Sequence, residues 1–247
     1  MKALDLKVGE PVLEIGPGRG ALTYPLAKTG VRLLLVEKDR ELATLLREKL
    51  PSAGVEILEA DFLEIKLGEI ESRLGPGFKV VSNLPYNVGT AILSKLLHAL
   101  APASRLVLMF QKEVGERLLA KPGSKDYGSL SVFAQLAAEG RLVCRVPPEA
   151  FRPSPQVESL VLAFEIRREP LLPRPDWENF ENFIRAGFAQ RRKMLRQNLR
   201  PALGRVEASE VERRLAAVGA KAGARAEELS VEQWVKLFKA RSGTPPG

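Results

Sequence analysis

The segment at residues 14–20 reads Glu14-Ile15-Gly16-Pro17-Gly18-Arg19-Gly20 and continues an apolar run that starts at Val12. A stretch with helical spacing of apolar residues comes next, and a second apolar run, Val31-Arg32-Leu33-Leu34-Leu35-Val36, follows it. Glycines after a strand allow a tight turn and a close approach of a ligand to the backbone. The order of these segments therefore predicts a strand, helix, strand unit with a ligand site at the end of its first strand.

The same alternation continues along the chain. We predict helices at about 40–50 and 90–100, and strands at 55–58, 78–82 and 105–110. Two further helical segments, separated at 121–124, precede two late strands at 142–146 and 159–164. Strands that alternate with helices form a parallel sheet covered on both faces. The predicted fold class is therefore α/β, with a Rossmann-like sheet that is mostly parallel and has an antiparallel edge.

The proline-rich segment at 167–175 is unsuited to a helix or a central strand, and it predicts a linker. Beyond it the apolar residues have helical spacing at 178–199, 208–218 and 231–240. These stretches predict a small C-terminal all-helical domain with Trp177 and Trp234 in its core. We place the two domains at 1–168 and 176–241.

Basic residues outnumber acidic residues by 38 to 30, and the resulting formal charge of +8 favours a polyanionic partner. Their distribution is more informative than their number. Seven of them crowd one C-terminal stretch: Arg185, Arg191, Arg192, Lys193, Arg196, Arg200 and Arg205. Such a cluster indicates either a surface that contacts phosphates or a solvated helix face.

Several classes of protein are excluded by composition. Cys144 and His98 are the only cysteine and the only histidine, so we expect no internal disulfide framework and no metal site. We interpret both as packing residues. No run approaches the roughly 20 apolar residues of a membrane span, and Met1 does not open a secretory signal. The expected location is the cytoplasm.

Acidic residues at two further strand ends identify the ligand of the glycine turn. The turn alone would also suit a dinucleotide. Glu37 ends the second strand, where it can accept hydrogen bonds from ribose hydroxyls. Asp61 follows the third strand, where it can accept a hydrogen bond from an adenine amino group. This convergence predicts a nucleoside site. The predicted cofactor-binding residues are Gly16, Pro17, Gly18, Glu37, Lys38, Asp61, Phe62 and Asn83.

Asn83-Leu84-Pro85-Tyr86 stands directly after the fourth predicted strand. These four residues resemble the Asn/Asp-Pro-Pro-Tyr type motif of amino-methylating enzymes, which implies an adenine amino group as the target. The amino nitrogen of adenine is a poor nucleophile because its lone pair is delocalised into the ring. Acceptors aimed at its two protons draw that pair back, and we assign this role to the Asn83 side chain and the Leu84 carbonyl. Pro85 stiffens the turn and Tyr86 stacks on the base. The base must leave its helical stack to reach such a site.

The tetrad resembles that of ribosomal RNA adenine dimethyltransferases of the KsgA (RsmA) type. The proline-rich stretch from Pro147 to Ser159 is similar to the family's Phe-x-Pro-x-Pro-x-Val-x-Ser segment, and 111–118, 127–132 and 188–195 resemble its other blocks. The last block resembles the opening basic helix of the family's helical domain. The resemblance spans nearly the whole chain.

The resemblance implies a methyltransferase sheet that uses S-adenosyl-L-methionine, and it makes Phe151 the second face of the base clamp. The catalytic residues are then Asn83, Leu84, Pro85, Tyr86 and Phe151. It implies dimethylation at N6 of two adjacent adenosines in the 3′-terminal hairpin loop of 16S rRNA during small-subunit biogenesis. The domain at 1–168 is then catalytic and that at 176–241 binds RNA. The predicted RNA contacts are Arg152, Arg191, Arg192, Lys193 and Arg196.

Two alternatives stay open, namely a large-subunit rRNA adenine methyltransferase, which shares the tetrad, and a non-catalytic factor that binds RNA or the ribosome. The family carries a Gln-Asn/His-Phe/Leu-Leu segment ahead of the first strand, whereas Met1 lies only a few residues before Val12. This predicts a shortened chain or a misplaced start. We expect the small-subunit precursor as partner, and a monomer, because no long apolar seam is evident.

Overall fold

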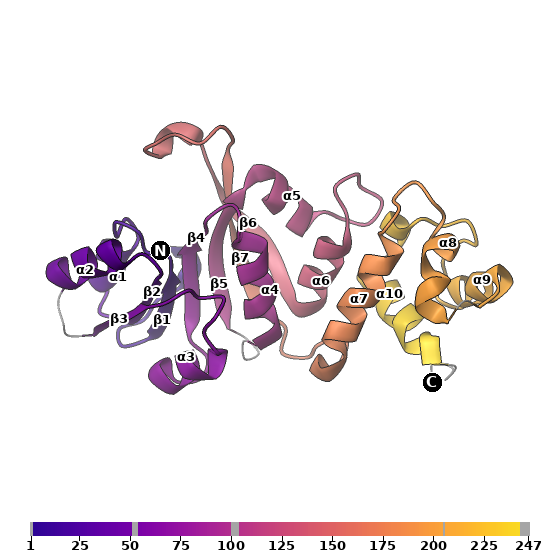
Figure 1. The fold of residues 1–247 in the computed structure, drawn as a ribbon, viewed down its shortest axis with the longest axis horizontal. Coiled ribbons are helices and arrows are strands. Elements are labelled where there is room, and N and C mark those ends of the chain that lie inside the picture. Colours follow the sequence, from indigo (N-terminus) through magenta and orange to yellow (C-terminus); the bar gives the residue numbers. More distant parts are fainter. Residues whose placement is uncertain (1, 51–53, 100–103, 205, 243–247) are drawn as a thin grey trace. The chain divides into compact units, whose positions relative to one another are not determined.

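The computed structural model describes residues 2–50, 54–99, 104–204 and 206–242. Its strands form one seven-stranded sheet in the order β3-β2-β1-β4-β5-β7-β6 (Figure 1). Their bounds are β1 Pro11–Ile15, β2 Arg32–Glu37, β3 Val55–Glu59, β4 Lys79–Asn83, β5 Arg105–Gln111, β6 Ala138–Val146 and β7 Ser159–Ile166. Strands β1 to β5 pair in parallel, and β7 pairs antiparallel with both β5 and β6. The predicted mostly parallel sheet with an antiparallel edge is confirmed.

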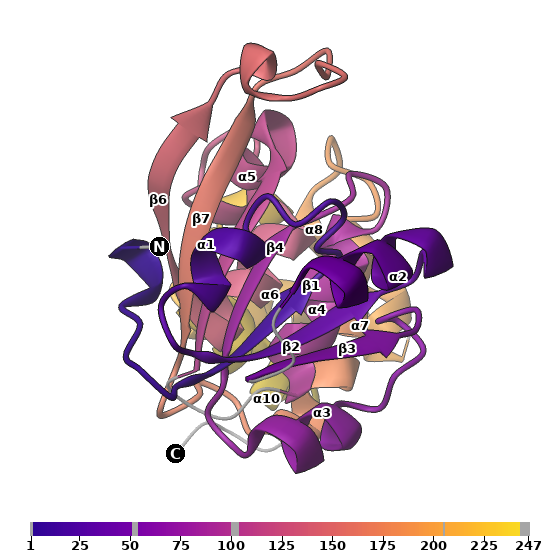
Figure 2. The ribbon, with the colours of Figure 1, turned by 90° about the vertical axis from the view of Figure 1, so that its left-hand side faces the viewer.

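The helices alternate with the strands and then continue alone. Their bounds are α1 Thr23–Ala27, α2 Arg40–Lys49, α3 Leu67–Leu74, α4 Gly89–Ala99, α5 Lys112–Leu119, α6 Ser129–Ala137, α7 Trp177–Gly187, α8 Leu195–Leu199, α9 Ala208–Ala217 and α10 Val231–Lys239. Figure 2 shows α2 and α3 on opposite sides of strands β1 to β3. Side chains of successive strand residues point to opposite faces, so these helices bury both.

One face of the sheet carries a continuous apolar cluster. It joins residues of the strands to Leu26 of α1, Leu46 of α2 and Leu4 of the short helix η1 (Lys2–Leu4). Leu4 is almost fully buried at 1% exposure. Burial of a leucine side chain is worth about 1.5 to 3 kcal/mol, so these contacts hold the chain ahead of β1 against the sheet.

The described residues divide into two compact units. The sheet unit comprises Met1–Gly115 and Ala138–Arg168, and the helical unit comprises Glu116–Ala137 and Glu169–Gly247. The predicted domains differ from these units in one segment, because 116–137 groups with the C-terminal helices. The physical reason lies in the apolar side chains of α6. Phe133 packs edge to face on Trp177, with ring centroids 5.9 Å apart.

The structure adds two details to the predicted helices. The stretch with helical spacing at 178–199 is divided between two helices, since α7 ends at Gly187 and α8 begins at Leu195. Glycine is a poor helix former, and the Asn198 side chain donates hydrogen bonds to the carbonyls of Gly187 and Gln190, which ends α7. The basic stretch 188–194 is consequently a loop. Helix α3, with Ile70 and Leu74 buried, has no counterpart among the predicted elements.

Both tryptophans lie in the core of the helical unit, as predicted. Trp177 and Trp234 are 1% and 0% exposed, and the indole N–H of Trp177 donates to the Leu172 carbonyl at 2.8 Å. Trp234 lies against Gly187, where an added Cβ would overlap the edge of its ring. Glycine at 187 therefore allows a close approach of the indole that no other residue permits.

Gly187→Ala is expected to destabilise the protein by about 1 to 3 kcal/mol, because overpacking a full core forces neighbouring side chains or backbone to shift. The free energy of unfolding measured in urea tests this. Gly223→Ala is the matched control in the same unit, since no atom lies within 4 Å of an added Cβ there. Equal stability of the two variants would contradict the packing argument.

Candidate active site

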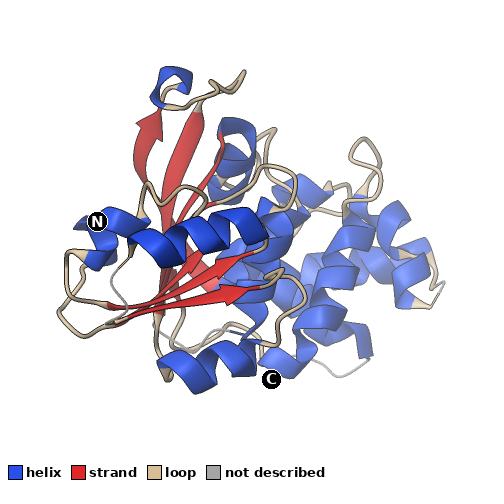
Figure 3. Cartoon of the chain, turned by 60° about the vertical axis from the view of Figure 1, so that its left-hand side comes forward, coloured by secondary structure: helices blue, strands red, loops and turns tan. Residues whose placement is uncertain are grey.

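The predicted site residues lie at or just after the carboxyl ends of the parallel strands, and these ends share one edge of the sheet. The strands of the sheet are drawn in red in Figure 3. Ile15 pairs with Val36 at the ends of β1 and β2, Glu37 pairs with Glu59, and Asn83 ends β4. Ligands of open parallel sheets bind at this edge. The topology therefore brings the glycine turn, the two acidic positions and the tetrad to the same side of the sheet unit.

The glycine turn leaves open space beside its backbone. Gly16 and Gly18 have φ values of 63° and 58°, which favour glycine over any other residue. An added Cβ at either position would meet no atom within 4 Å. The Gly16 N–H donates to the Val36 carbonyl at 2.9 Å and fixes the turn onto β2. The turn can therefore accommodate a ligand directly against the chain.

Glu37 fastens this turn to the end of β2. Its side chain is buried, with Oε2 accepting from the Gly18 N–H at 3.0 Å and Oε1 accepting from the Asp39 N–H at 2.9 Å. Asp39 in turn caps α2 through the N–H groups of Glu41 and Leu42. Each carboxylate oxygen has a further lone pair. Glu37 can thus hold the turn and still accept hydrogen bonds from a ligand.

Asp61 is paired with Lys38 across the ends of β2 and β3. The Lys38 Nζ lies 2.7 Å from Asp61 Oδ2, and the Leu63 N–H donates to Oδ1 at 2.9 Å. The hydrogen bond from Lys38 holds the pKa of Asp61 below its usual range. These two predicted cofactor residues therefore contact each other directly.

Lys95 of α4 fixes the loop that carries Asp61. Its Nζ donates to the carbonyls of Phe62 and Leu63 at 2.9 and 2.7 Å and lies 5.3 Å from the centroid of the Phe62 ring. Phe62 is buried at 4% exposure, so this ring packs below the surface rather than facing solvent. Nothing in the sequence pattern distinguished Lys95 from the other lysines.

Glu14 is a buried acid that the motif contains but that no predicted role used. It is 2% exposed, and neither its Oε2 nor the nearby Thr23 Oγ1 has a hydrogen-bond partner among the described residues. Burial raises the pKa of Glu14 to about 7, and the charge of Glu37 adds to this increase, although the Thr23 hydroxyl opposes it. An unpartnered acidic oxygen therefore lies at the glycine turn.

This buried acid predicts a pH dependence of stability. The unfolded chain releases the Glu14 proton near pH 4.5 and the folded protein near pH 7. The free energy of unfolding should therefore fall as pH rises through that window, by about 1 to 3 kcal/mol, and level off above it. Urea unfolding of wild type and Glu14→Gln at pH 4.5 to 8.5 measures this loss, and the variant should lack it.

Glu48→Gln is the control for this measurement. Glu48 is exposed, so this variant should keep the wild-type dependence of the free energy of unfolding on pH. Parallel profiles for wild type and Glu14→Gln would contradict the assignment.

A cavity of about 260 Å³ lies beside the tetrad and brings together the residues predicted to hold the target base. It is lined by Asn83, Leu84, Pro85, Tyr86, Phe151, Pro153 and Pro155. Asn83 is exposed, and its side chain makes no hydrogen bond to any other described residue. Leu84 is buried at 2% and Tyr86 is 39% exposed. The same cavity is therefore lined by an available amide group and by two aromatic side chains.

The predicted RNA contacts fall into two groups. Arg191 donates to the carbonyls of Lys125 and Tyr127, and Arg196 is paired with Glu212, so both bind other parts of the helical unit. Arg192 and Lys193 are exposed in the loop before α8, and Arg152 is exposed in the loop between β6 and β7. The basic stretch is therefore partly structural.

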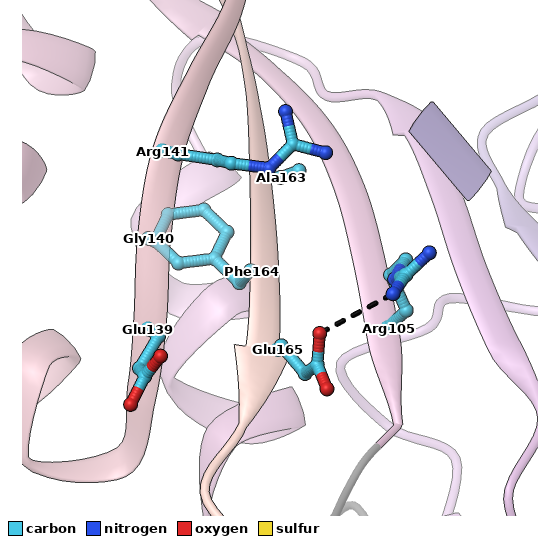
Figure 4. A pocket seen from close by; sticks show the side chains of 7 residues that line it. All are labelled: Arg105, Glu139, Gly140, Arg141, Ala163, Phe164 and Glu165. Carbon is cyan, nitrogen blue, oxygen red and sulfur yellow. Dashed lines mark hydrogen bonds and ion pairs between the residues drawn. The ribbon is translucent and has the colours of Figure 1, made fainter. Parts of the chain in front are cut away.

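A second cavity, of about 220 Å³, lies at the opposite ends of the strands (Figure 4). Its lining includes Arg105 at the start of β5 and Glu139 near the start of β6. Arg105 pairs with Glu165 at 3.3 Å, and Glu139 pairs with Arg167 at 2.8 Å. These charges largely neutralise one another, and the cavity lies away from the tetrad.

The two residues interpreted as packing residues have different environments. His98 lies half-buried on α4, whereas Cys144 is exposed on β6, so the interpretation of Cys144 is wrong. Residues 139–145 of β6 are all exposed, so neither face of this part of the strand is covered. In the described part of the chain, no three His, Cys, Asp or Glu side chains gather as metal ligands. Nor does that part contain a helix long and apolar enough to span a membrane.

The chain is similar to ribosomal RNA small-subunit methyltransferases A of several bacteria. It is 43% identical over 241 residues to that of Thermosynechococcus vestitus, covering 95% of this chain and 87% of the relative. It is 43% identical over 233 residues to that of Geobacter sulfurreducens, covering 94% and 84%. These relatives therefore match the chain through both of its units.

Solved structures agree in fold. A dimethyladenosine transferase from Plasmodium falciparum gives a TM-score of 0.77 at 23% identity, covering 98% of this chain and 94% of that one. The 23S rRNA methyltransferase ErmE gives 0.71 at 29% identity with the same coverage. The family model described as ribosomal RNA adenine dimethylase matches residues 1–242. This chain belongs to the ribosomal RNA adenine dimethylase family, whose members are S-adenosylmethionine-dependent methyltransferases.

Proposed function

We propose that this protein transfers methyl groups from S-adenosylmethionine to N6 of two adjacent adenosines in the 3′-terminal hairpin loop of 16S rRNA. The observation that carries the proposal is the cavity in which Asn83, Tyr86 and Phe151 meet at the edge that bears the glycine turn. The names of the relatives in T. vestitus and G. sulfurreducens supply the small subunit as the source of the RNA.

The residues of the glycine turn fit the cofactor. The open space at Gly16 and Gly18 admits a ligand against the backbone, and Glu37 is fixed beside them with lone pairs to spare. Glu14 adds a buried oxygen without a partner. We assign Gly16, Pro17, Gly18, Glu37, Lys38, Asp61 and Phe62 to cofactor binding. Asp61 must share its carboxylate between Lys38 and the adenine amino group.

Asn83 and Leu84 prepare the target nitrogen for attack. S-adenosylmethionine supplies an electrophilic methyl group on a sulfonium sulfur. The Asn83 amide oxygen and the Leu84 carbonyl oxygen accept the two protons of the adenine amino group in hydrogen bonds, which concentrates the lone pair on nitrogen. The buried Leu84 side chain anchors the backbone that carries this carbonyl. After transfer, the extra proton on nitrogen leaves to solvent through the open cavity.

Tyr86 and Phe151 hold the base between them. Both line the same cavity and come from different loops, after β4 and after β6 respectively. A base that has left its helical stack loses stacking energy, and two aromatic faces replace part of it. The prolines at 153 and 155 stiffen the loop of Phe151.

The helical unit and the loop of Phe151 supply RNA contacts. Arg152, Arg192 and Lys193 are the exposed candidates for phosphate binding, whereas Arg191 and Arg196 contribute mainly by holding their segments in place. We propose the small-subunit precursor as the partner, a monomer as the active form, and the cytoplasm as the place of action.

The alternatives receive less support. The similarity to ErmE favours a large-subunit activity. However, the chain is only 29% identical to ErmE, whereas it is 43% identical to the small-subunit methyltransferase of T. vestitus. A non-catalytic binding factor would have no need for the exposed and unpaired amide of Asn83.

The deciding experiment is methyl transfer from labelled S-adenosylmethionine to small subunits that lack the modification, with large subunits alongside. The labelled nucleoside is identified by mass. Dimethyladenosine in the small subunit alone supports the proposal. Label in the large subunit alone favours the ErmE-like activity, and cofactor binding without transfer to either subunit favours the binding factor.

A further inference from the structure

Ser159 is a fully buried polar residue next to the target cavity. It is the first residue of β7 and is 0% exposed. Its backbone pairs with Gln111 of β5 on one side and with Val146 of β6 on the other. A residue paired on both sides within a sheet has little freedom to move, so the backbone position from which its hydroxyl group projects is fixed.

Among the described residues, the hydroxyl group of Ser159 has one hydrogen-bond partner, the phenol of Tyr86. The two oxygens lie 2.9 Å apart, and either can donate. A buried hydroxyl group strongly favours a partner because it has lost its hydrogen bonds to water. The sheet therefore holds the far end of a side chain that comes from another loop, 73 residues earlier in the sequence.

The Tyr86 ring would otherwise have little to fix it. It is 39% exposed in the loop between β4 and α4, where a turn closes through a hydrogen bond from the Val88 N–H to the Pro85 carbonyl. That turn restrains the backbone of Tyr86 but does not act on its two side-chain torsions. Exposed side chains change rotamer within picoseconds to nanoseconds. A tether at the phenol oxygen removes this freedom.

We propose that Ser159 is a positioning residue that fixes the ring of Tyr86 as one wall of the target cavity. This inference rests on the proposed function, because it assigns the ring to the target base. Stacking is effective only when the ring face is already aligned, and holding a group in position reduces the entropy lost in the transition state. Ser159 itself touches no reacting atom.

Kinetics of a double-mutant cycle test this role. Ser159→Ala and Tyr86→Phe each remove one end of the hydrogen bond, and each is expected to lower kcat by about tenfold while the cofactor Kd stays within about twofold. The double variant should be no slower than either single variant, since the same interaction is lost. A kcat of the double variant that is about 100-fold below that of the wild type would show independent effects and would overturn the proposal.

A measurement without substrate separates this inference from the proposed function. The chain has three tyrosines, and labelling with 3-fluorotyrosine gives each a fluorine resonance, of which Tyr86 is identified by its loss in Tyr86→Phe. Ser159→Ala should shift and sharpen the Tyr86 resonance and leave those of Tyr24 and Tyr127 unchanged. An unchanged Tyr86 resonance would refute the tether, even if the wild type transfers methyl groups. A shifted resonance with an inactive wild type would support the tether while the proposed function fails.

Ser104→Ala is the matched control. Ser104 is also a buried serine of the sheet unit, 3% exposed, but its hydroxyl group has no hydrogen-bond partner among the described residues. Removing it should leave kcat and the Tyr86 resonance as in the wild type. The same loss of kcat in Ser104→Ala and Ser159→Ala would mean that any buried serine of the sheet gives this effect, which would contradict a specific positioning role.

Discussion

Asn83→Ala is expected to slow methyl transfer by about 100- to 1,000-fold, the usual effect of removing one preorganised group that stabilises a transition state. The Asn83 amide lies in the cavity with Tyr86 and Phe151 and is not engaged elsewhere in the described structure. Its loss removes the acceptor for one amino proton and leaves the glycine turn untouched. Cofactor binding should therefore change by less than about threefold.

Single-turnover methyl transfer and calorimetric titration with S-adenosylmethionine measure the two effects of Asn83→Ala separately. Asn87→Ala is the control, because Asn87 is an exposed asparagine of the same loop, lies one residue beyond Tyr86 and does not line the cavity. It should behave as the wild type in both assays. Equal loss of transfer and cofactor binding in Asn83→Ala would contradict a role confined to the target base.

Glu37→Ala should weaken cofactor binding by about 100-fold. The Glu37 carboxylate accepts from the N–H groups of Gly18 and Asp39, and hydrogen bonds to charged groups are worth about 1.5 to 3 kcal/mol each. Its loss releases the glycine turn and also removes the acceptor assigned to the ribose. We expect the rate of transfer at saturating cofactor to fall much less than the affinity.

Equilibrium dialysis with labelled cofactor gives the Kd, and thermal unfolding reports the cost to the fold. Glu41→Ala is the control because Glu41 is exposed in the first turn of α2, four residues further along the chain. An unchanged Kd in Glu37→Ala, with a lowered Tm, would assign this carboxylate to the fold alone.

The sequence predicts those features that depend on local pattern. The apolar runs at 31–36 and 105–110 coincide with strands β2 and β5, and the glycines at 16 and 18 adopt the positive φ values that their turn requires. Because parallel strands end at a common edge, the acids and the tetrad could be placed there from their order alone. One cavity is lined by both Asn83 and Phe151, and the base clamp inferred from family resemblance stays a prediction for it.

Features that depend on distant contacts could not be predicted. Arg191 looks like a phosphate ligand in the sequence, but the structure engages it with two backbone carbonyls that lie more than 60 residues away. The end of α7 at Gly187 depends on the Asn198 side chain. The hydrogen bond between Tyr86 and Ser159 joins residues that are 73 positions apart, and no pattern in the sequence indicates that they meet. Such pairings arise only when the sheet and the helices are assembled.

Each of the two units is built from two separate segments of the chain, so neither can be completed in a single stretch of synthesis. During synthesis, α6 emerges well before Trp177, so Phe133 cannot pack on its aromatic partner until Trp177 has also been made. Likewise, β6 emerges before β7, the strand that joins it to β5. A gene divided after codon 168 would thus not yield a self-sufficient catalytic half. Its product would carry α6 without α7 and α10, the helices that pack against it in the whole chain.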